Sequence, residues 1–295
     1  RAAAGGLPDP DRPALRPRGH AERDAGSGSH PGGLLDAGAV ALQDSIDEFV
    51  AWCGREPSCV LHGRDVKALI ATIFGRIDRE EIIIPGDPPR PARPFDFIQV
   101  MTEALRFPAW AAIAEFLLAV ENEVTPRSMA MTMATTSPGV PFAGRAVRCA
   151  DFLLPMRDHA EYTRLVRRSA TVTPDMRYPA DRMDQVIRCL GTPAPIPNPQ
   201  HKLRVHQLKT PILLVNNRHD PITGYTMATA VAQQLGRNGR LLTHDGWGHG
   251  AYGRSACIDA IVDRYLVTLE LPLPGTSCPG VPFPEGGSTP LAARS

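Results

Sequence analysis

The sequence predicts an α/β protein in which a long helical region precedes a short alternation of strands and helices. Helical spacing of apolar residues dominates residues 34–193, and a strand–helix–strand–helix order follows in residues 194–280. The 295 residues are enough for one large α/β domain or two small ones. We therefore expect a helical layer joined to part of a doubly wound parallel sheet.

The first 33 residues differ in composition from the rest of the chain. They are rich in Pro, Gly, Arg and Ala and contain almost no large apolar residue. Such a segment cannot bury enough apolar surface to offset the entropy lost on ordering. We expect residues 1–33 to be a disordered or non-native leader, and ordered structure to begin near Leu34.

Residues 34–193 are predicted to be helices joined by long connections. Apolar residues between Leu42 and Cys53 recur at helical spacing, and Pro-rich loops such as Pro85–Pro94 separate the predicted helices. No alternation of strands and helices is visible in this region. The other helices predicted here are Phe95–Leu105, Trp110–Val120 and Asp158–Ser169.

A loop over Ala194–Gln200 opens the C-terminal segment. The apolar runs Pro211–Asn216 and Arg240–Thr243 have the length of buried parallel strands. Two amphipathic helices alternate with them, which gives a βαβα unit, and Gly236 is the predicted end of the first helix. The helices are Tyr225–Leu235 and Cys257–Leu269, the second with Ile258, Ile261, Val262, Tyr265 and Leu266 facing inward; polar loops are predicted over Asn217–Thr223 and Asp245–Gly253, and a loose tail over 281–295.

The composition argues against two classes of partner. The formal net charge is +1, and no segment interleaves basic with aromatic residues as RNA-binding modules do. No apolar run approaches the roughly 18 to 20 residues that span a bilayer. We expect neither a nucleic-acid nor a membrane partner. The sequence begins with Arg1 and shows no charged segment followed by an apolar one, so we expect either that a signal peptide has been removed or that the true start lies upstream.

The six cysteines fall into three sequence neighbourhoods. An even number permits full pairing, and no Cys-x-x-Cys spacing favours a zinc or thioredoxin-like site. The neighbourhoods suggest three local disulfides and with them an extracytoplasmic location. Six buried free thiols in a cytosolic protein are the alternative. The suggested pairs are Cys53–Cys59, Cys149–Cys189 and Cys257–Cys278.

Asp220 and His249 are the candidate catalytic residues. Each follows one of the two predicted strands, so both are expected at the same edge of the sheet. An Asp beside a His orients the imidazole and stabilises the imidazolium, and the His then acts as a general base toward a hydroxyl nucleophile. Their order is that of the last two members of a Ser–Asp–His triad. Gly246 and Gly248 would free the imidazole to project.

Two other interpretations of these residues remain open. An Asp after a strand is often a turn or helix N-cap residue, and a His between glycines is often a turn residue. A metal site is the second alternative, but the sequence has no HExxH, HxH or paired-Cys spacing. We expect no metal and no cofactor. The histidines concerned are His201, His206, His219, His244 and His249.

No nucleophile is found in the sequence. A Gly-x-Ser-x-Gly elbow between a strand and a helix is the expected pattern, and no serine of the chain has these neighbours. There is no Gly-rich oxyanion loop, and a disulfide explains Cys257 better than a nucleophilic role does. Among the serines with a glycine nearby, Ser27, Ser255, Ser277 and Ser288 all lack the pattern.

Short stretches within about residues 194–280 form a recognisable set. They are Asn198-Pro-Gln-His201, Pro211–Asn216, His219-Asp-Pro221, Thr223-Gly-Tyr225, Leu241-Leu-Thr243, Gly246-Trp-Gly-His249, Tyr252-Gly-Arg254 and Gly275-Thr-Ser-Cys-Pro279. With them the segment resembles the tripeptidyl-aminopeptidase-like (TAP-like) family of secreted actinobacterial α/β-hydrolases. A weaker resemblance over about residues 40–190 rests on Trp52-Cys53, Cys59, Leu61-His-Gly63, Cys149-Ala-Asp151, Pro174–Tyr178 and Cys189-Leu-Gly191.

The resemblance implies the C-terminal part of an α/β-hydrolase sheet preceded by a helical cap. It also implies a catalytic Asp220 and His249, disulfides, secretion, and release of short peptides from free N-termini. Family members carry an upstream half with the oxyanion loop and the serine elbow, which this sequence lacks. We therefore expect an N-terminally truncated serine hydrolase for peptides or small amides and esters, inactive by itself. A non-catalytic binding protein and an esterase or lipase are the alternatives.

Overall fold

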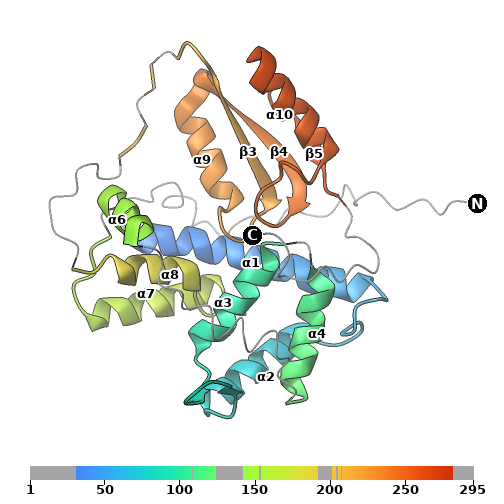
Figure 1. Ribbon diagram of the computed structural model, residues 1–295, viewed down its shortest axis with the longest axis vertical. Coiled ribbons are helices and arrows are strands. Elements are labelled where there is room, and N and C mark those ends of the chain that lie inside the picture. The colour runs from blue at the N-terminus through green and yellow to red at the C-terminus, as the bar shows by residue number, and fades with distance from the viewer. Residues whose placement is uncertain are drawn as a thin grey trace, which may run out of the picture.

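The computed structural model describes residues 31–107, 109–123, 142–152, 154–191, 201–203, 205–206 and 208–281. Two regions are distinguished within them: the helical region, residues 31–191, and the α/β segment, residues 208–281 (Figure 1). Most of the predicted leader, the predicted loop Ala194–Gln200 and most of the tail lie outside the described residues.

Helices form most of the helical region. The long helix α1 begins at Pro31, three residues before the predicted start, and ends at Arg55. The predictions at Phe95, Trp110 and Asp158 are confirmed, and Asp158 caps its helix by accepting the N–H of Glu161. The remaining helices are α2 (Val66–Asp78), α3 (Pro94–Leu105), α4 (Trp110–Glu121), α6 (Phe142–Asp151), α7 (His159–Val172) and α8 (Ala180–Arg188).

A small antiparallel ribbon interrupts the helices and corrects the expectation of an unbroken loop there. β1 (Ile83–Ile84) pairs with β2 (Arg90–Pro91), which lies inside the predicted loop Pro85–Pro94. The Arg90 guanidinium binds both carboxylate oxygens of Asp96 at 2.7 and 2.8 Å. Strands of two residues carry no periodic signal, so the sequence pattern does not reveal them.

A large hydrophobic core, beside a smaller cluster of Leu34, Leu154 and Val186, fills most of the helical region. It joins α1, α2, α3, α4 and α8, and the rings of Phe74, Phe97 and Phe116 meet inside it. Phe49 of α1 is completely buried. These helices therefore bury their apolar faces mainly against one another, and Trp247 of the sheet packs against the same core.

The α/β segment is a three-stranded parallel sheet with helices on both sides. The strands β3 (Ile212–His219), β4 (Gly239–Trp247) and β5 (Ser277–Pro279) lie in that order. α9 (Tyr225–Leu235) and α10 (Ala256–Thr268) flank them, as Figure 1 shows, and the 3₁₀ turn η1 (Gly236–Asn238) follows α9. The predicted βαβα unit is confirmed, and Gly236 does end α9.

Alternating side chains explain which helix covers which face. Leu213, Val215 and Leu242 pack against Ile258, Ile261 and Val262 of α10. On the opposite face the hydroxyl of Tyr225, at the start of α9, lies 2.7 Å from that of Thr243. Successive residues of a strand point to opposite faces, so each helix contacts its own set.

Three details of the segment differ from the prediction. Both strands run further than expected, β3 to His219 and β4 to Trp247, because the backbone pairing continues through polar residues that an apolar pattern does not mark. β5 was not predicted, because three residues are too few for a periodic signal. Leu266 of α10 is 65 % exposed: the adjacent Tyr265 hydroxyl donates to the Pro211 carbonyl just before β3, whose outer edge has no strand partner among the described residues.

All six cysteines are paired as the three local pairs predicted. The disulfides are Cys53–Cys59, Cys149–Cys189 and Cys257–Cys278. The last one ties α10 to β5. Of the helices in the described ranges, none is both long and apolar enough to cross a membrane.

Candidate active site

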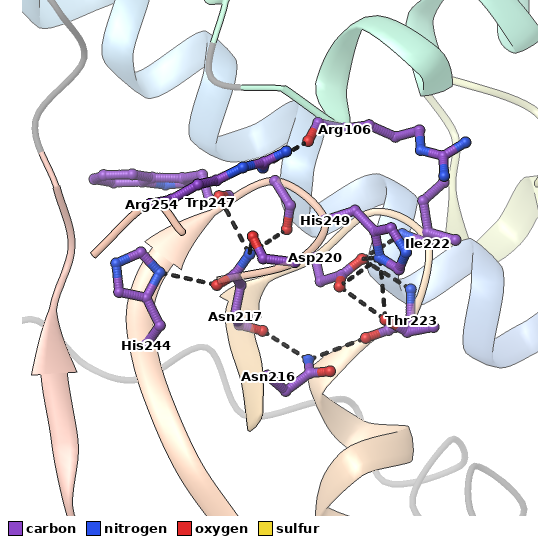
Figure 2. Close-up of polar contacts among 12 residues, drawn as sticks. Arg106, Asn216, Asn217, Asp220, Ile222, Thr223, His244, Trp247, His249 and Arg254 are labelled. Carbon is purple, nitrogen blue, oxygen red and sulfur yellow. Dashed lines mark hydrogen bonds and ion pairs between the residues drawn. The ribbon is translucent and has the colours of Figure 1, made fainter. Parts of the chain in front are cut away.

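Asp220 and His249 contact each other just beyond the ends of β3 and β4 (Figure 2). The imidazole Nδ1 of His249 lies 3.0 Å from Oδ2 of Asp220 and 3.2 Å from Oδ1. Asp220 is 3 % exposed, whereas about a third of the His249 side chain is open to solvent. The two side chains therefore meet at the edge of the sheet, as their positions after the two strands predict.

The carboxylate of Asp220 is held by its own turn. Its Oδ1 accepts the backbone N–H groups of Ile222 and Thr223 at 2.8 Å each. Its Oδ2 accepts the Thr223 hydroxyl, also at 2.8 Å. The turn interpretation of Asp220 is therefore correct as well, and it does not compete with the contact to His249. The turn fixes the carboxylate in the orientation that faces the imidazole.

The backbone of His249 is anchored to the end of helix α3. Its N–H donates to the carbonyl of Arg106 at 2.9 Å, and the guanidinium of Arg254 reaches the same carbonyl at 3.3 Å. Gly248 has φ +85°, and a Cβ there would lie 2.8 Å from the Arg106 oxygen. Only glycine fits this approach, so the helical region and the His249 loop meet backbone to backbone.

The Nε2 atom of His249 has no hydrogen-bond partner among the described residues. Asp220 occupies the Nδ1 side, and the Thr223 hydroxyl lies 3.3 Å from Nδ1. With Nδ1 carrying the proton, Nε2 presents a lone pair that can accept a proton from a hydroxyl. The arrangement has the chemistry of a general base whose tautomer is set by a buried carboxylate.

Helix α1 of the helical region contacts the strand ends beside this pair. Asp44 lies 2.8 Å from Nδ1 of His219, and Glu48 accepts the indole N–H of Trp247 at 3.1 Å. Burial alone would lower the pKa of His219, but the hydrogen bond and the charge of Asp44, with the charge of Glu48, raise it. His219 stacks on Trp247 with ring centroids 6.1 Å apart.

Aromatic rings continue from this contact into the helical core. Trp247 meets Trp110 edge to face at 5.5 Å, and Trp110 meets Trp52 at 5.7 Å. The next ring is that of Phe49. Edge-to-face and offset pairs of this kind contribute about 0.5–1.5 kcal/mol each beyond their area burial. The site's strand ends are therefore packed firmly on the helical region.

The histidines considered for a metal site are dispersed over different partners. His219 pairs with Asp44, His244 with the side-chain oxygen of Asn217, and His249 with Asp220. Within the described ranges no three His, Cys, Asp or Glu side chains are arranged to hold a metal ion.

Sequence reasoning missed the supporting residues of the site. Thr223 stands three residues after Asp220, a spacing typical of side-chain-capped turns, and this signal was available. Asn217 binds the carbonyls around His249, and the Arg106 carbonyl anchors its backbone. These two contacts join residues far apart in the chain, so no local sequence pattern predicts them.

A parallel sheet with an Asp and a His after neighbouring strands is the C-terminal architecture of an α/β-hydrolase. Residues 175–278 match the family model described as TAP-like protein, and this part of the chain is therefore a TAP-like α/β-hydrolase domain.

The curated relatives found are proteins named serine protease Hip1. The Mycobacterium bovis protein is 27 % identical over 261 residues, which cover 81 % of this chain and 49 % of the relative. Two Mycobacterium tuberculosis strains have a Hip1 with the same values. The chain thus spans about half the length of these relatives.

Proposed function

We propose that Asp220 and His249 are the acid and the general base of a serine exopeptidase that releases short peptides from free N-termini. The observation that carries the proposal is the contact of 3.0 Å between His249 Nδ1 and the buried Asp220 carboxylate, with Nε2 left available. The resemblance to TAP-like hydrolases supports the substrate class, and the Hip1 relatives support the serine mechanism.

In this mechanism His249 Nε2 takes the proton of a serine hydroxyl as the serine attacks the scissile carbonyl. Asp220 keeps the Nδ1 proton in place and stabilises the imidazolium that forms. His249 then gives the proton to the leaving amine. Because no serine of the chain stands in a Gly-x-Ser-x-Gly elbow, the nucleophile is proposed to come from sequence outside this chain.

The three disulfides support an extracytoplasmic location for this activity. Disulfides persist in oxidising compartments and are rare in the cytosol. The proposed substrate is therefore a peptide, or a small amide or ester, met outside the cytoplasm.

The test uses a fluorescent serine-directed phosphonate and tripeptidyl p-nitroanilides on two samples. One is this chain alone, and the other is the native protein captured from its source with an antibody against this chain. We expect labelling and hydrolysis by the native protein and neither by the chain. Hydrolysis by the isolated chain that is lost in His249→Ala would overturn the proposal of an external serine.

If the native protein is neither labelled by the phosphonate nor able to hydrolyse the nitroanilides, the enzymatic proposal is overturned as a whole and a binding protein is favoured. Preference for simple p-nitrophenyl esters over peptidyl anilides would instead indicate an esterase on the same site. A peptide with a blocked N-terminus is the matched control for the exopeptidase assignment, since only a free ammonium should be accepted.

A further inference from the structure

We propose that Asn217 is a positioning residue that holds the His249 loop, residues 247–250, against Asp220. The inference rests on the proposed function, because it concerns the same Asp–His pair. Asn217 lies in β3 and is 1 % exposed, and Figure 2 shows it between His244 and the loop. It does not touch the imidazole, so its effect on catalysis would act through the loop.

The side-chain amide of Asn217 binds the backbone on both sides of His249. Its Nδ2 lies 2.6 Å from the carbonyl oxygen of Gly248 and 3.3 Å from that of Gly250. The carbonyl of Trp247 is a third, longer contact at 3.4 Å. One amide group therefore fixes the peptide units that precede and follow the catalytic imidazole.

The strand ladder reaches only the start of this loop, where the Gly248 N–H donates to the His219 carbonyl at 3.1 Å. The β3–β4 register shifts between Asn217 and His219, and the last paired residues are His219 and Trp247. Beyond that point the loop backbone turns through glycines, with Gly248 and Gly250 both at φ +85°. Asn217 thus supplies hydrogen bonds where the regular ladder ends.

The surrounding carbonyls determine how the Asn217 amide is oriented. Three carbonyl oxygens face one end of the amide, so that end must be the donor NH₂. The oxygen Oδ1 then faces Nδ1 of His244 at 2.8 Å. Because Oδ1 only accepts, His244 must donate from Nδ1.

The surroundings of His244 agree with this tautomer. The residue is buried, and its Nε2 has no partner among the described residues, so a proton there would be unsatisfied. Burial lowers the pKa of His244, which keeps the ring neutral. Gly246 lies against the ring, where a Cβ would come within 2.3 Å of it. The ring therefore stays in place and presents its Nδ1–H to Asn217.

Long-range ¹H–¹⁵N correlation spectra of this chain, labelled at histidine, report which ring nitrogen of His249 carries the proton. We expect the neutral ring of the unaltered chain to be in the Nδ1–H form. Asn217→Asp keeps the size and the acceptor for His244 but removes the donor. We expect the Nε2–H form, which free histidine prefers, to become the major one.

Asn122→Asp is the matched control, because Asn122 is an exposed C-cap residue of α4 far along the chain from the site. It should leave the His249 tautomer unchanged. Thermal melts of both variants establish that they are folded at the temperature of the spectra. An unaltered His249 tautomer in folded Asn217→Asp would overturn the positioning role.

A pair of His244 variants decides the question if Asn217→Asp does not fold. His244→Asn places an amide donor near the former Nδ1, whereas His244→Leu has no donor. We expect His244→Leu to disturb the His249 tautomer and His244→Asn to retain it. Equal behaviour of the two variants would contradict the proposal, because a purely structural role does not depend on that donor.

Kinetics on the native protein separate this inference from the proposed function. Asn217→Asp should lower kcat by about 10²-fold with KM little changed, as misplacement of a catalytic group does. If the tautomer shifts as expected but the native protein never hydrolyses peptides, the proposed function fails and the positioning role stands. If Asn217→Asp has an unchanged kcat and an unchanged His249 tautomer, the proposed enzymatic function stands and the positioning role of Asn217 is overturned.

Discussion

The helical region and the α/β segment bury their apolar residues very differently. The helical region holds a large core that extends from Leu35 of α1 to Met183 of α8. Among the described residues, the corresponding cluster of the segment has four buried members, Leu242, Ala251, Ile258 and Cys278. Leu213 and Val215 of its first strand are only half-buried.

This difference in burial indicates that one region provides most of the stability and the other provides the candidate site. The region with the large core supplies helices and an anchoring carbonyl, and the thin segment supplies Asp220 and His249. The outer edge of β3 has no strand partner among the described residues. The segment therefore depends on its disulfide and on contacts with the helical region to hold the site, as marginal cores generally depend on additional constraints.

The largest effect is expected from a cavity in the helical core. Phe97→Ala removes a ring that packs between Phe74 and Phe116 and should lower the free energy of unfolding by about 3–5 kcal/mol. Urea unfolding followed by circular dichroism measures this loss. Hydrogen exchange should show the lost protection in α2, α3 and α4 and little change in β3 and β4. Equal loss in both regions would show that they unfold as one unit.

An intermediate effect is expected from removing the disulfide of the segment. Cys257→Ala with Cys278→Ala opens a link that spans 21 residues and should cost about 3 kcal/mol. The matched control, Cys53→Ala with Cys59→Ala, opens a link of six residues and should cost about 2 kcal/mol. Thermal melts measure both losses. If the helical-region variant were the less stable one, dependence of the segment on its disulfide would be contradicted.

The smallest effect concerns the ion pair between the regions. The pKa of His219 is raised in the folded protein, so its pair with Asp44 stabilises fully below the ordinary value of 6.5. The contribution is lost as the pH rises through the folded pKa, since the unfolded chain has already released its proton. Because Asp44 is 44 % exposed, we expect less than about 1 kcal/mol.

Asp44→Asn should therefore lower the free energy of unfolding at about pH 5.5 and leave it nearly unchanged at high pH, as measured by urea unfolding. Asp47→Asn on the same helix is the control, because Asp47 pairs with Lys67 rather than with a histidine. A pH-independent cost of Asp44→Asn would mean that its contact with His219 does not depend on the charge of the imidazole.

The sequence predicted elements that depend on local patterns and missed contacts made across the fold. The α9 boundaries, the βαβ order and the three disulfides follow from spacing within short windows. The approach of Asp220 to His249 follows from sheet topology. The strands β1, β2 and β5 are too short to show a periodic pattern of apolar residues. Leu266 of α10 was predicted to face inward but is exposed, because the width of the sheet cannot be inferred from the local sequence.

The site shows the same limit. Asp220 and His249 can be identified from the sequence because they are residue types suited to acid–base chemistry and each follows a predicted strand. Asn217 is a strand residue whose partners lie about 30 residues away, and the anchoring carbonyl of Arg106 belongs to another region. Backbone carbonyls have no sequence signature, so supporting contacts of this kind become visible only in three dimensions.

The aromatic contacts between the regions have a consequence for spectroscopy. The chain contains three tryptophans, and all of them, Trp52, Trp110 and Trp247, stand in the single run of rings that crosses from α1 and α4 to the end of β4. Intrinsic fluorescence is therefore a local signal from this junction. A change in emission would report separation of the two regions beside His249 even while every helix remained intact, and fluorescence and circular dichroism would then record two different events.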